Sequence, residues 1–141
     1  MLIRNNYFLE NRLNYLWQKH FPDIKKINLV RIKFGRKARR QLGSIRFDPQ
    51  KNISRIIITS YFRSSKVPSF VIDSTIAHEL THFAQGFASH HKKLLHYPHQ
   101  GGVVNKELDK RGLKEKRSKT RKWLKENWLK FIKNYDRTKR K

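Results

Sequence analysis

Cysteine and long apolar runs are both missing from this sequence. Without cysteine, disulfide bonds, thiolate-ligated zinc and a nucleophilic cysteine are excluded, so any metal ligand must be His, Asp or Glu. No apolar run approaches the roughly 20 residues that span a bilayer. Polar residues, among them Asn5, Asn6 and Glu10, interrupt the region where a signal peptide needs a continuous apolar core. We therefore expect a cytoplasmic protein with no membrane partner.

Acidic residues are also scarce, because 10 Asp and Glu stand against 34 Lys and Arg, which gives a formal net charge of +24. Residues 25–46 hold nine basic residues and no acidic one, and residues 106–141 hold 16 basic and five acidic residues. Such a cationic surface attracts polyanions, and phosphate backbones are the usual counterpart. We expect DNA to bind it, which would make the protein nucleoid-associated. The alternative is the solvated surface of a lysine-rich protein.

The candidate nucleic-acid contacts come from these two basic segments. They are Arg36, Lys37, Arg39, Arg40, Lys119, Arg121, Lys122 and Trp123. Aromatic rings among basic residues can stack on unpaired bases. Trp128 and Phe131 fall on an apolar helical stripe and are expected in the core, which leaves Trp123 as the aromatic residue expected at the surface.

The length of 141 residues suits a single domain with one core, and we expect a monomer. Apolar spacing predicts helices at 2–20, 68–86, 103–113 and 120–135. Alternating or β-branched residues predict strands at 27–34, 44–47 and 55–60. A histidine-rich stretch at 87–100 is predicted to be a loop, and residues 136–141 are expected to fray. Together these elements predict an α+β domain with a small, mostly antiparallel sheet.

The strongest motif is His78-Glu79-Leu80-Thr81-His82, within the most apolar predicted helix. Histidines four residues apart lie on one helix face, near enough for both imidazoles to bind one ion, and zinc suits such ligands. Glu79 can take a proton from a metal-bound water, as the general base of such sites does. The bland alternative is two satisfied core histidines beside an ion-paired Glu79. The motif favours zinc, because three titratable groups in an apolar helix are costly to bury without a partner.

A catalytic zinc usually has three protein ligands and one open position, so a third ligand must come from elsewhere. The candidates are His90, His91, His96, His99 and the carboxylate of Glu107. Spacing alone does not choose among them.

The chain resembles the SprT-like metallopeptidases, a family that includes the Spartan proteases, which cleave proteins crosslinked to DNA. The resemblance rests on the five-residue motif and on four flanking features: Leu42-Gly43-Ser44, Ile56-Ile57-Ile58-Thr59, Pro68 and Pro98-His99-Gln100-Gly101. It covers about residues 27–113. A basic helical extension at about 114–141 replaces the cysteine-rich zinc ribbon of many bacterial relatives.

The resemblance implies a minimal zincin fold, with an N-terminal helix, a three-stranded sheet, an active-site helix and a ligand helix. It also implies that His99 is the third zinc ligand and that an extended peptide pairs with a strand beside the cleft. His96 or Tyr97 is a candidate donor to the oxyanion.

These observations predict a zinc-dependent endopeptidase that associates with DNA and acts on unfolded or DNA-crosslinked protein. Two alternatives stay open. One is a gluzincin-type peptidase with Glu107 as third ligand and no nucleic acid. The other is a non-catalytic, zinc-stabilised nucleic-acid-binding module, against which Glu79 argues because a structural site needs no base.

Overall fold

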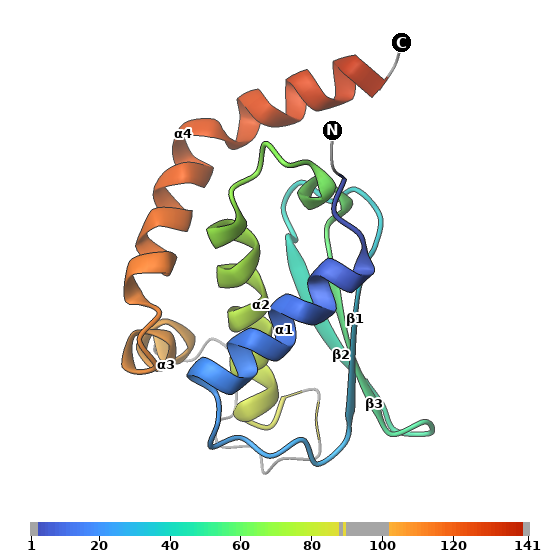
Figure 1. Ribbon diagram of the computed structural model, residues 1–141, viewed down its shortest axis with the longest axis vertical. Coiled ribbons are helices and arrows are strands. Elements are labelled where there is room, and N and C mark those ends of the chain that lie inside the picture. Colours follow the sequence, from blue (N-terminus) through green and yellow to red (C-terminus); the bar gives the residue numbers. More distant parts are fainter. Residues whose placement is uncertain (1–2, 88, 90–101, 140–141) are drawn as a thin grey trace.

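The computed structural model describes residues 3–87, 89 and 102–139, and within them helices and a three-stranded sheet form an α+β fold (Figure 1). The α+β layout expected from the sequence is therefore confirmed. In chain order the elements are α1 (Asn6–His20), β1 (Leu29–Phe34), β2 (Gly43–Asp48), β3 (Ile53–Ile58), the 3-10 helix η1 (Ser60–Arg63), α2 (Ser69–Ala84), α3 (Val103–Lys110) and α4 (Lys114–Lys139).

The sheet has the strand order β1-β3-β2, with β3 in the centre. The expectation of a mostly antiparallel sheet is wrong for one of its two pairings, because β1 and β3 run parallel while β2 and β3 run antiparallel. The Asp48-Pro49 turn joins β2 to β3. The Asp48 carboxylate accepts hydrogen bonds from the main-chain N–H groups of Gln50 and Lys51. The hairpin inserts β3 between the two earlier strands, which makes the sheet mixed.

One face of the sheet is covered by helices. Along β3, Ser54, Ile56 and Ile58 are buried and alternate with half-buried residues. Along β1, Ile32 and Phe34 are buried while the residue between them is exposed, which is the alternation that the sequence predicts. Helix α1 packs on β1, and α2 packs on β2 and β3.

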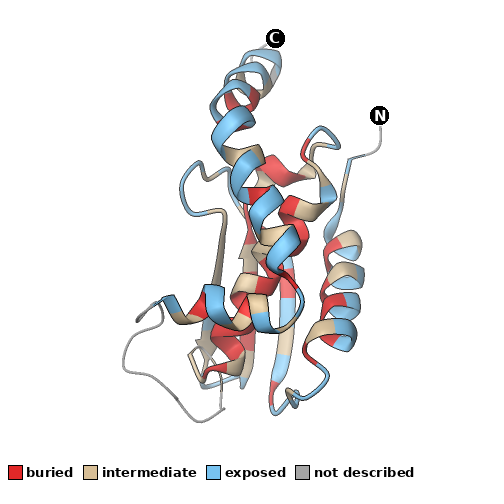
Figure 2. Cartoon of the chain, turned by 90° about the vertical axis from the view of Figure 1, so that its left-hand side faces the viewer, coloured by how far each residue is buried: buried red, intermediate tan, exposed pale blue. Residues whose placement is uncertain are grey.

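Helix α2 lies at the centre of the molecule, between the sheet and α4 (Figure 1). Ten of its 16 residues are buried, among them the polar Asp73, Glu79 and His82. Figure 2 looks onto α4 and shows mostly exposed residues on that helix, with buried residues gathered behind it. Trp128, Phe131 and Ile132 of α4 belong to the same core as Leu9, Leu13, Leu16 and Trp17 of α1. Both apolar stripes predicted from the sequence therefore face the core.

Helix α2 ends at a glycine, as the sequence predicts. Gly86 has a φ of 86°, in the left-handed region that favours glycine. The N–H of Gly86 donates to the Phe83 carbonyl, and the N–H of Phe87 donates to the His82 carbonyl at 2.9 Å. This is the Schellman arrangement, and it turns Phe87 back toward the last turn of α2.

Helix α4 is longer than predicted, since it begins at Lys114 rather than near residue 120 and extends to Lys139. Its first turns lack apolar residues with a helical period, but they consist largely of good helix formers. Two ion pairs anchor them, Lys116 with Asp73 and Arg117 with Asp109. Among the described helices, none combines the length and apolar character needed to cross a membrane.

Candidate functional site

His78 and His82 lie one turn apart on α2, and their rings approach each other. Their Nε2 atoms are 3.2 Å apart, and the ring planes are inclined by 83°. Two imidazole nitrogens bound to one tetrahedral zinc at about 2.0–2.1 Å would be about 3.3 Å apart. The histidine pair therefore already has the spacing of two ligands of one ion, and the donor set fits zinc.

The Glu79 carboxyl group is almost removed from water, with only 6% of the residue exposed. This burial raises the pKa of Glu79 to about 7. A divalent cation held by the neighbouring histidines would oppose the shift, since a nearby positive charge favours the carboxylate. The carboxyl group lies close to β2, because a Cβ atom added at Gly43 would be 3.2 Å from Glu79 Oε2.

A cavity of about 710 Å³ opens in front of the three motif side chains. Its walls come from α2 and the segment just after it, from β2 and the loop before it, and from one residue of α4. The lining residues are Arg40, Gln41, Leu42, Gly43, Ser44, Ile45, Ser74, Thr75, His78, Glu79, His82, Phe87 and Thr120. The ring of Phe87 stands nearly perpendicular to that of His82, with centroids 6.3 Å apart. The cavity is thus a cleft between the motif helix and the end strand of the sheet.

Gly43 and Thr75 bring the two walls of this cleft together, and neither is among the site residues predicted from the sequence. A Cβ atom at Gly43 would lie 2.8 Å from Thr75 Cγ2, closer than real Cβ contacts come. The Thr75 hydroxyl donates to the Val71 carbonyl at 2.8 Å, which holds that side chain in place. Only glycine fits here. For Thr75 the sequence did contain a signal, because it precedes Glu79 by four residues and therefore lies on the same face of the helix.

The outer edge of β2 faces the cleft. Thr59 N–H donates to the Leu42 carbonyl at 2.9 Å, so these two residues occupy a hydrogen-bonded position of the antiparallel ladder. Such positions alternate, and the main-chain groups of Gly43 and Ile45 therefore point away from β3. Within the described part of the chain, no strand pairs with β2 on that side. The cleft thus has a strand edge opposite the histidine pair.

The predicted third ligand, His99, lies outside the described residues, as do His90, His91, His96 and Tyr97. Within residues 3–87, 89 and 102–139, no group of three or more His, Cys, Asp or Glu side chains could hold a metal ion. Glu107, the alternative ligand, is on α3, and its carboxylate forms an ion pair with Arg111 at 2.8 Å. The described structure therefore does not bring Glu107 to the histidine pair.

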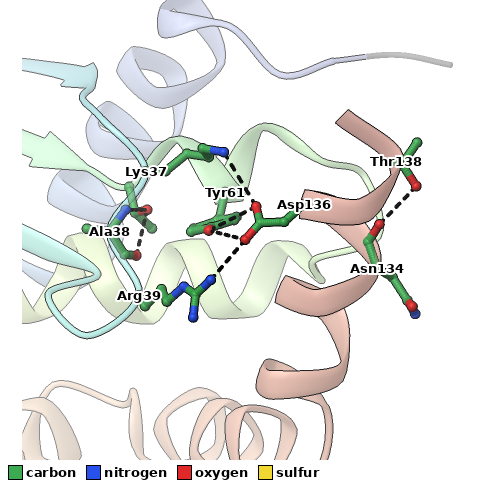
Figure 3. Close-up of polar contacts among 8 residues, drawn as sticks. Lys37, Ala38, Arg39, Tyr61, Asn134, Asp136 and Thr138 are labelled. Carbon is green, nitrogen blue, oxygen red and sulfur yellow. Dashed lines mark hydrogen bonds and ion pairs between the residues drawn. The ribbon is translucent and has the colours of Figure 1, made fainter. Parts of the chain in front are cut away.

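The predicted basic contacts fall into two groups, and the first is attached to α4. Lys37 and Arg39 form ion pairs with Asp136 at 3.4 and 3.1 Å, and the Tyr61 hydroxyl donates to the same carboxylate (Figure 3). The indole N–H of Trp128 donates to the Arg39 carbonyl at 2.8 Å. Helix α4 therefore fixes the loop that leads into the cleft wall at Arg40.

The second group is exposed on the surface. Arg36, Arg40, Lys119, Arg121 and Lys122 are all exposed, and Lys119 forms an ion pair with Glu115 at 3.2 Å. Trp123 was expected at the surface but is half-buried, with its ring centroid 6.3 Å from those of Trp128 and Phe131. Trp128 and Phe131 are buried, as predicted. The structure thus brings Arg40 to the cleft, whereas Lys119, Arg121 and Lys122 do not line it.

Two imidazole nitrogens at ligand spacing and a buried carboxyl group stand opposite a strand edge. These groups can bind a divalent cation, move a proton and pair with an extended chain. This interpretation rests on the geometry of the site itself, because no protein-family model, no curated protein and no solved structure matches the chain.

Proposed function

We propose that this chain is a zinc-dependent endopeptidase of the SprT-like kind, which associates with DNA and acts on unfolded or DNA-crosslinked protein. One observation carries the proposal. The Nε2 atoms of His78 and His82 lie 3.2 Å apart, and the buried carboxyl group of Glu79 is beside them at the wall of a cleft. Two neutral imidazoles joined by an N–H···N hydrogen bond can have the same spacing, so metal content is the measurement that separates two zinc ligands from a satisfied core pair.

His78 and His82 are two of the proposed zinc ligands, and His99 is the third. Zinc bound there would polarise a carbonyl group and make water more acidic, without redox chemistry of its own. The absence of cysteine fits this ligand set, since imidazole nitrogen is the remaining donor that zinc prefers. Phe87 lines the cleft beside His82, with the two rings nearly perpendicular.

Glu79 is the proposed general base. Its carboxylate accepts a proton from the attacking water, and the resulting carboxylic acid passes that proton to the leaving amine. Its position is set from two sides, by the backbone of α2 and by the close approach of Gly43. A carboxyl group held in this way needs no rearrangement at the moment of reaction.

The substrate is proposed to bind as an extended strand along the outer edge of β2. The main-chain groups of Gly43 and Ile45 would hydrogen-bond to it, and this pairing is independent of side-chain identity. The proposal therefore predicts little sequence preference, and it requires a substrate segment without stable structure. A folded domain would not present such a segment.

DNA association is proposed through the exposed basic side chains. Arg40 lies on the cleft wall itself, and Arg36 is close to it in the same loop. Phosphates bound there would hold a protein attached to DNA near the histidine pair. The exposed cations Lys119, Arg121 and Lys122 on α4 would add to the attraction for phosphate.

The decisive experiment compares cleavage of an unfolded protein by the purified wild-type chain and by Glu79→Gln, with and without DNA and a chelator. Glu79→Gln should retain zinc and lose at least about 100-fold in rate, because it removes the proton acceptor alone. The chelator should abolish wild-type cleavage, and added zinc should restore it. Activity that survives Glu79→Gln would overturn the proposal, and zinc binding without any cleavage would favour the non-catalytic nucleic-acid-binding module.

A further inference from the structure

A second cavity, of about 560 Å³, lies between α4 from Trp123 onward, the end of η1 with the segment after it, and the N-terminal segment at Ile3. It shares no lining residue with the cleft at His78. Its volume falls within the range of about 300–1,000 Å³ that is typical of small-molecule and cofactor sites. The cavity is therefore a separate candidate site, independent of the proposed peptidase centre.

The described lining of this cavity carries only positive charge. Arg63, Lys66 and Lys130 line it, and no Asp or Glu does. None of the three forms an ion pair with a described carboxylate. The Arg63 guanidinium is engaged outside the cavity, because it lies over the Phe34 ring and donates to the Arg4 carbonyl at 3.4 Å, whereas Lys66 and Lys130 are exposed. Elsewhere in the structure basic side chains do have acidic partners, for example Lys116 with Asp73. The cavity is thus suited to an anionic ligand.

The same cavity has an aromatic wall made by Trp123, Phe131 and Tyr135 of α4. Trp123 is half-buried, and its ring is inclined by 57° and 56° to those of Trp128 and Phe131, so it is not stacked on either. The indoles of Trp17 and Trp128 donate to the carbonyls of Ile24 and Arg39. Trp123 has no such acceptor among the described residues, although a partly buried indole N–H normally finds one.

A planar ring surface beside several cations matches a ligand that combines a flat aromatic group with phosphate. We propose that this cavity binds an unpaired nucleotide of a single-stranded nucleic acid, with the base on Trp123 and the phosphates at Lys66 and Lys130. Paired bases do not offer their faces to a side chain, whereas every unpaired base does. The site therefore selects single strands over duplex, largely without regard to sequence.

The test measures binding by fluorescence anisotropy, using a labelled oligothymidylate of about 12 nucleotides and the full chain. Trp123→Leu should weaken binding about tenfold, because a base loses its stacking partner, while Trp123→Phe should retain most of the affinity. The double variant Lys66→Gln, Lys130→Gln should also weaken binding. Its matched control, Lys33→Gln with Lys125→Gln, removes the same charge from exposed positions outside the cavity and should have a much smaller effect.

Three results would overturn the proposal. The first is equal binding by Trp123→Leu and wild type. The second is an equal loss of affinity in the two lysine double variants, which would mean attraction by net charge alone. The third is a lack of selectivity for an unpaired strand. Either duplex DNA would then bind as tightly as the single strand, or a free mononucleotide would compete as well as the oligonucleotide. An RNA strand of the same length should bind, since both sugars leave the base face open.

Two controls separate this site from folding and from the proposed peptidase. Thermal unfolding of each variant shows whether the fold is kept. If Trp123→Leu does not fold, the lysine double variants still test the site, because they alter only surface side chains. Glu79→Gln should bind the oligonucleotide as wild type does. Loss of cleavage in Glu79→Gln would therefore not contradict the proposed nucleotide site. Loss of nucleotide binding in Trp123→Leu would likewise not contradict the proposed peptidase activity.

Discussion

Arg12 of α1 binds both carboxylate oxygens of Asp73 on α2, with N···O distances of 2.8 and 2.6 Å. The Asp73 side chain is only 3% exposed, and Lys116 of α4 donates to it at 2.8 Å. One buried carboxylate thus joins three helices, five residues before His78. It fixes the rotation of the helix that carries the candidate metal ligands.

Asp73→Asn should destabilise the fold by about 2 kcal/mol, because Arg12 and Lys116 would keep their charge without a full counter-charge. Both cations are about one-third exposed, which keeps the destabilisation below the roughly 3–5 kcal/mol that is typical of fully buried pairs. Urea denaturation measures the change. The matched control is Asp109→Asn, which removes the more exposed pair with Arg117 and should destabilise the fold less than Asp73→Asn does.

Gly43→Ala should damage the candidate site more than it damages the fold. The new Cβ would collide with Thr75 and approach Glu79, so β2 must shift away from α2. Overpacking of this kind costs about 1–3 kcal/mol, and cleavage should fall by more than the decrease in folded protein explains. Gly35→Ala is the control for overpacking alone, because its Cβ would collide with Ile57 even more closely, at a position without contact to Thr75 or Glu79. Adding Thr75→Ser, which removes the colliding methyl group, should restore activity to Gly43→Ala; failure to do so would contradict this account.

His99→Ala should reduce zinc affinity by more than the roughly 10- to 100-fold that removal of an outer-shell partner causes, because a direct ligand is removed. Glu107→Gln should leave the zinc content unchanged, since the Glu107 carboxylate is bound by Arg111. Metal analysis of the purified variants measures both effects. Unchanged zinc in His99→Ala would transfer the role of third ligand to another residue, and His96→Ala is the next variant to measure.

Asp136 should make the fold less stable as the pH falls into the acid range. Partial removal from water acts to raise the pKa of Asp136, but Tyr61, Lys37 and Arg39 outweigh it and hold the pKa below its ordinary value of 3.8. The stabilisation is therefore present above that value and is lost as the pH falls through the lower pKa of the folded state. The urea midpoint of wild type should exceed that of Asp136→Asn at neutral pH, and the two should converge below pH 3.8. A gap of constant size would exclude the charge as its cause.

DNA affinity should fall steeply with salt, because each bound phosphate releases a condensed counterion. Arg121→Gln with Lys122→Gln should weaken binding and reduce the salt slope by about one unit for each phosphate that is no longer neutralised. Arg31→Gln with Lys33→Gln, on β1, is the matched control. A flat salt response in wild type, or equal slopes in the two variants, would remove the α4 surface from the proposal.

The elements were predictable wherever a side-chain period marked a buried face. Leu9, Leu13 and Leu16 indicated α1, and alternation around Ile32 indicated β1. The start of α4 was not predictable from apolar period, because Lys116 and Arg117 hold it through ion pairs to other helices. The relative direction of the strands was also not predictable, since an alternating pattern shows which side chains are buried but not which strand lies alongside.

The part of the candidate site that lies on one helix was predictable from the sequence, but the contacts between distant segments were not. The spacing of His78 and His82 predicts that both side chains lie on one helix face, and the 3.2 Å separation of their Nε2 atoms confirms that placement, while their role as metal ligands stays a prediction. The approach of Gly43 depends on how β2 meets α2, and nothing local to Gly43 encodes it. The ion pairs of Asp136 with Lys37 and Arg39 likewise join residues almost 100 positions apart.

The central position of β3 also bears on the order in which the molecule can be assembled during translation. The two strands made first, β1 and β2, are not neighbours, and both must wait for Ile53–Ile58 before either gains a hydrogen-bonded partner. The ribosome makes η1 and α2 directly afterwards. A nascent chain that stops short of β3 therefore carries two unsatisfied strands, and those are the segments that a chaperone would have to protect from aggregation.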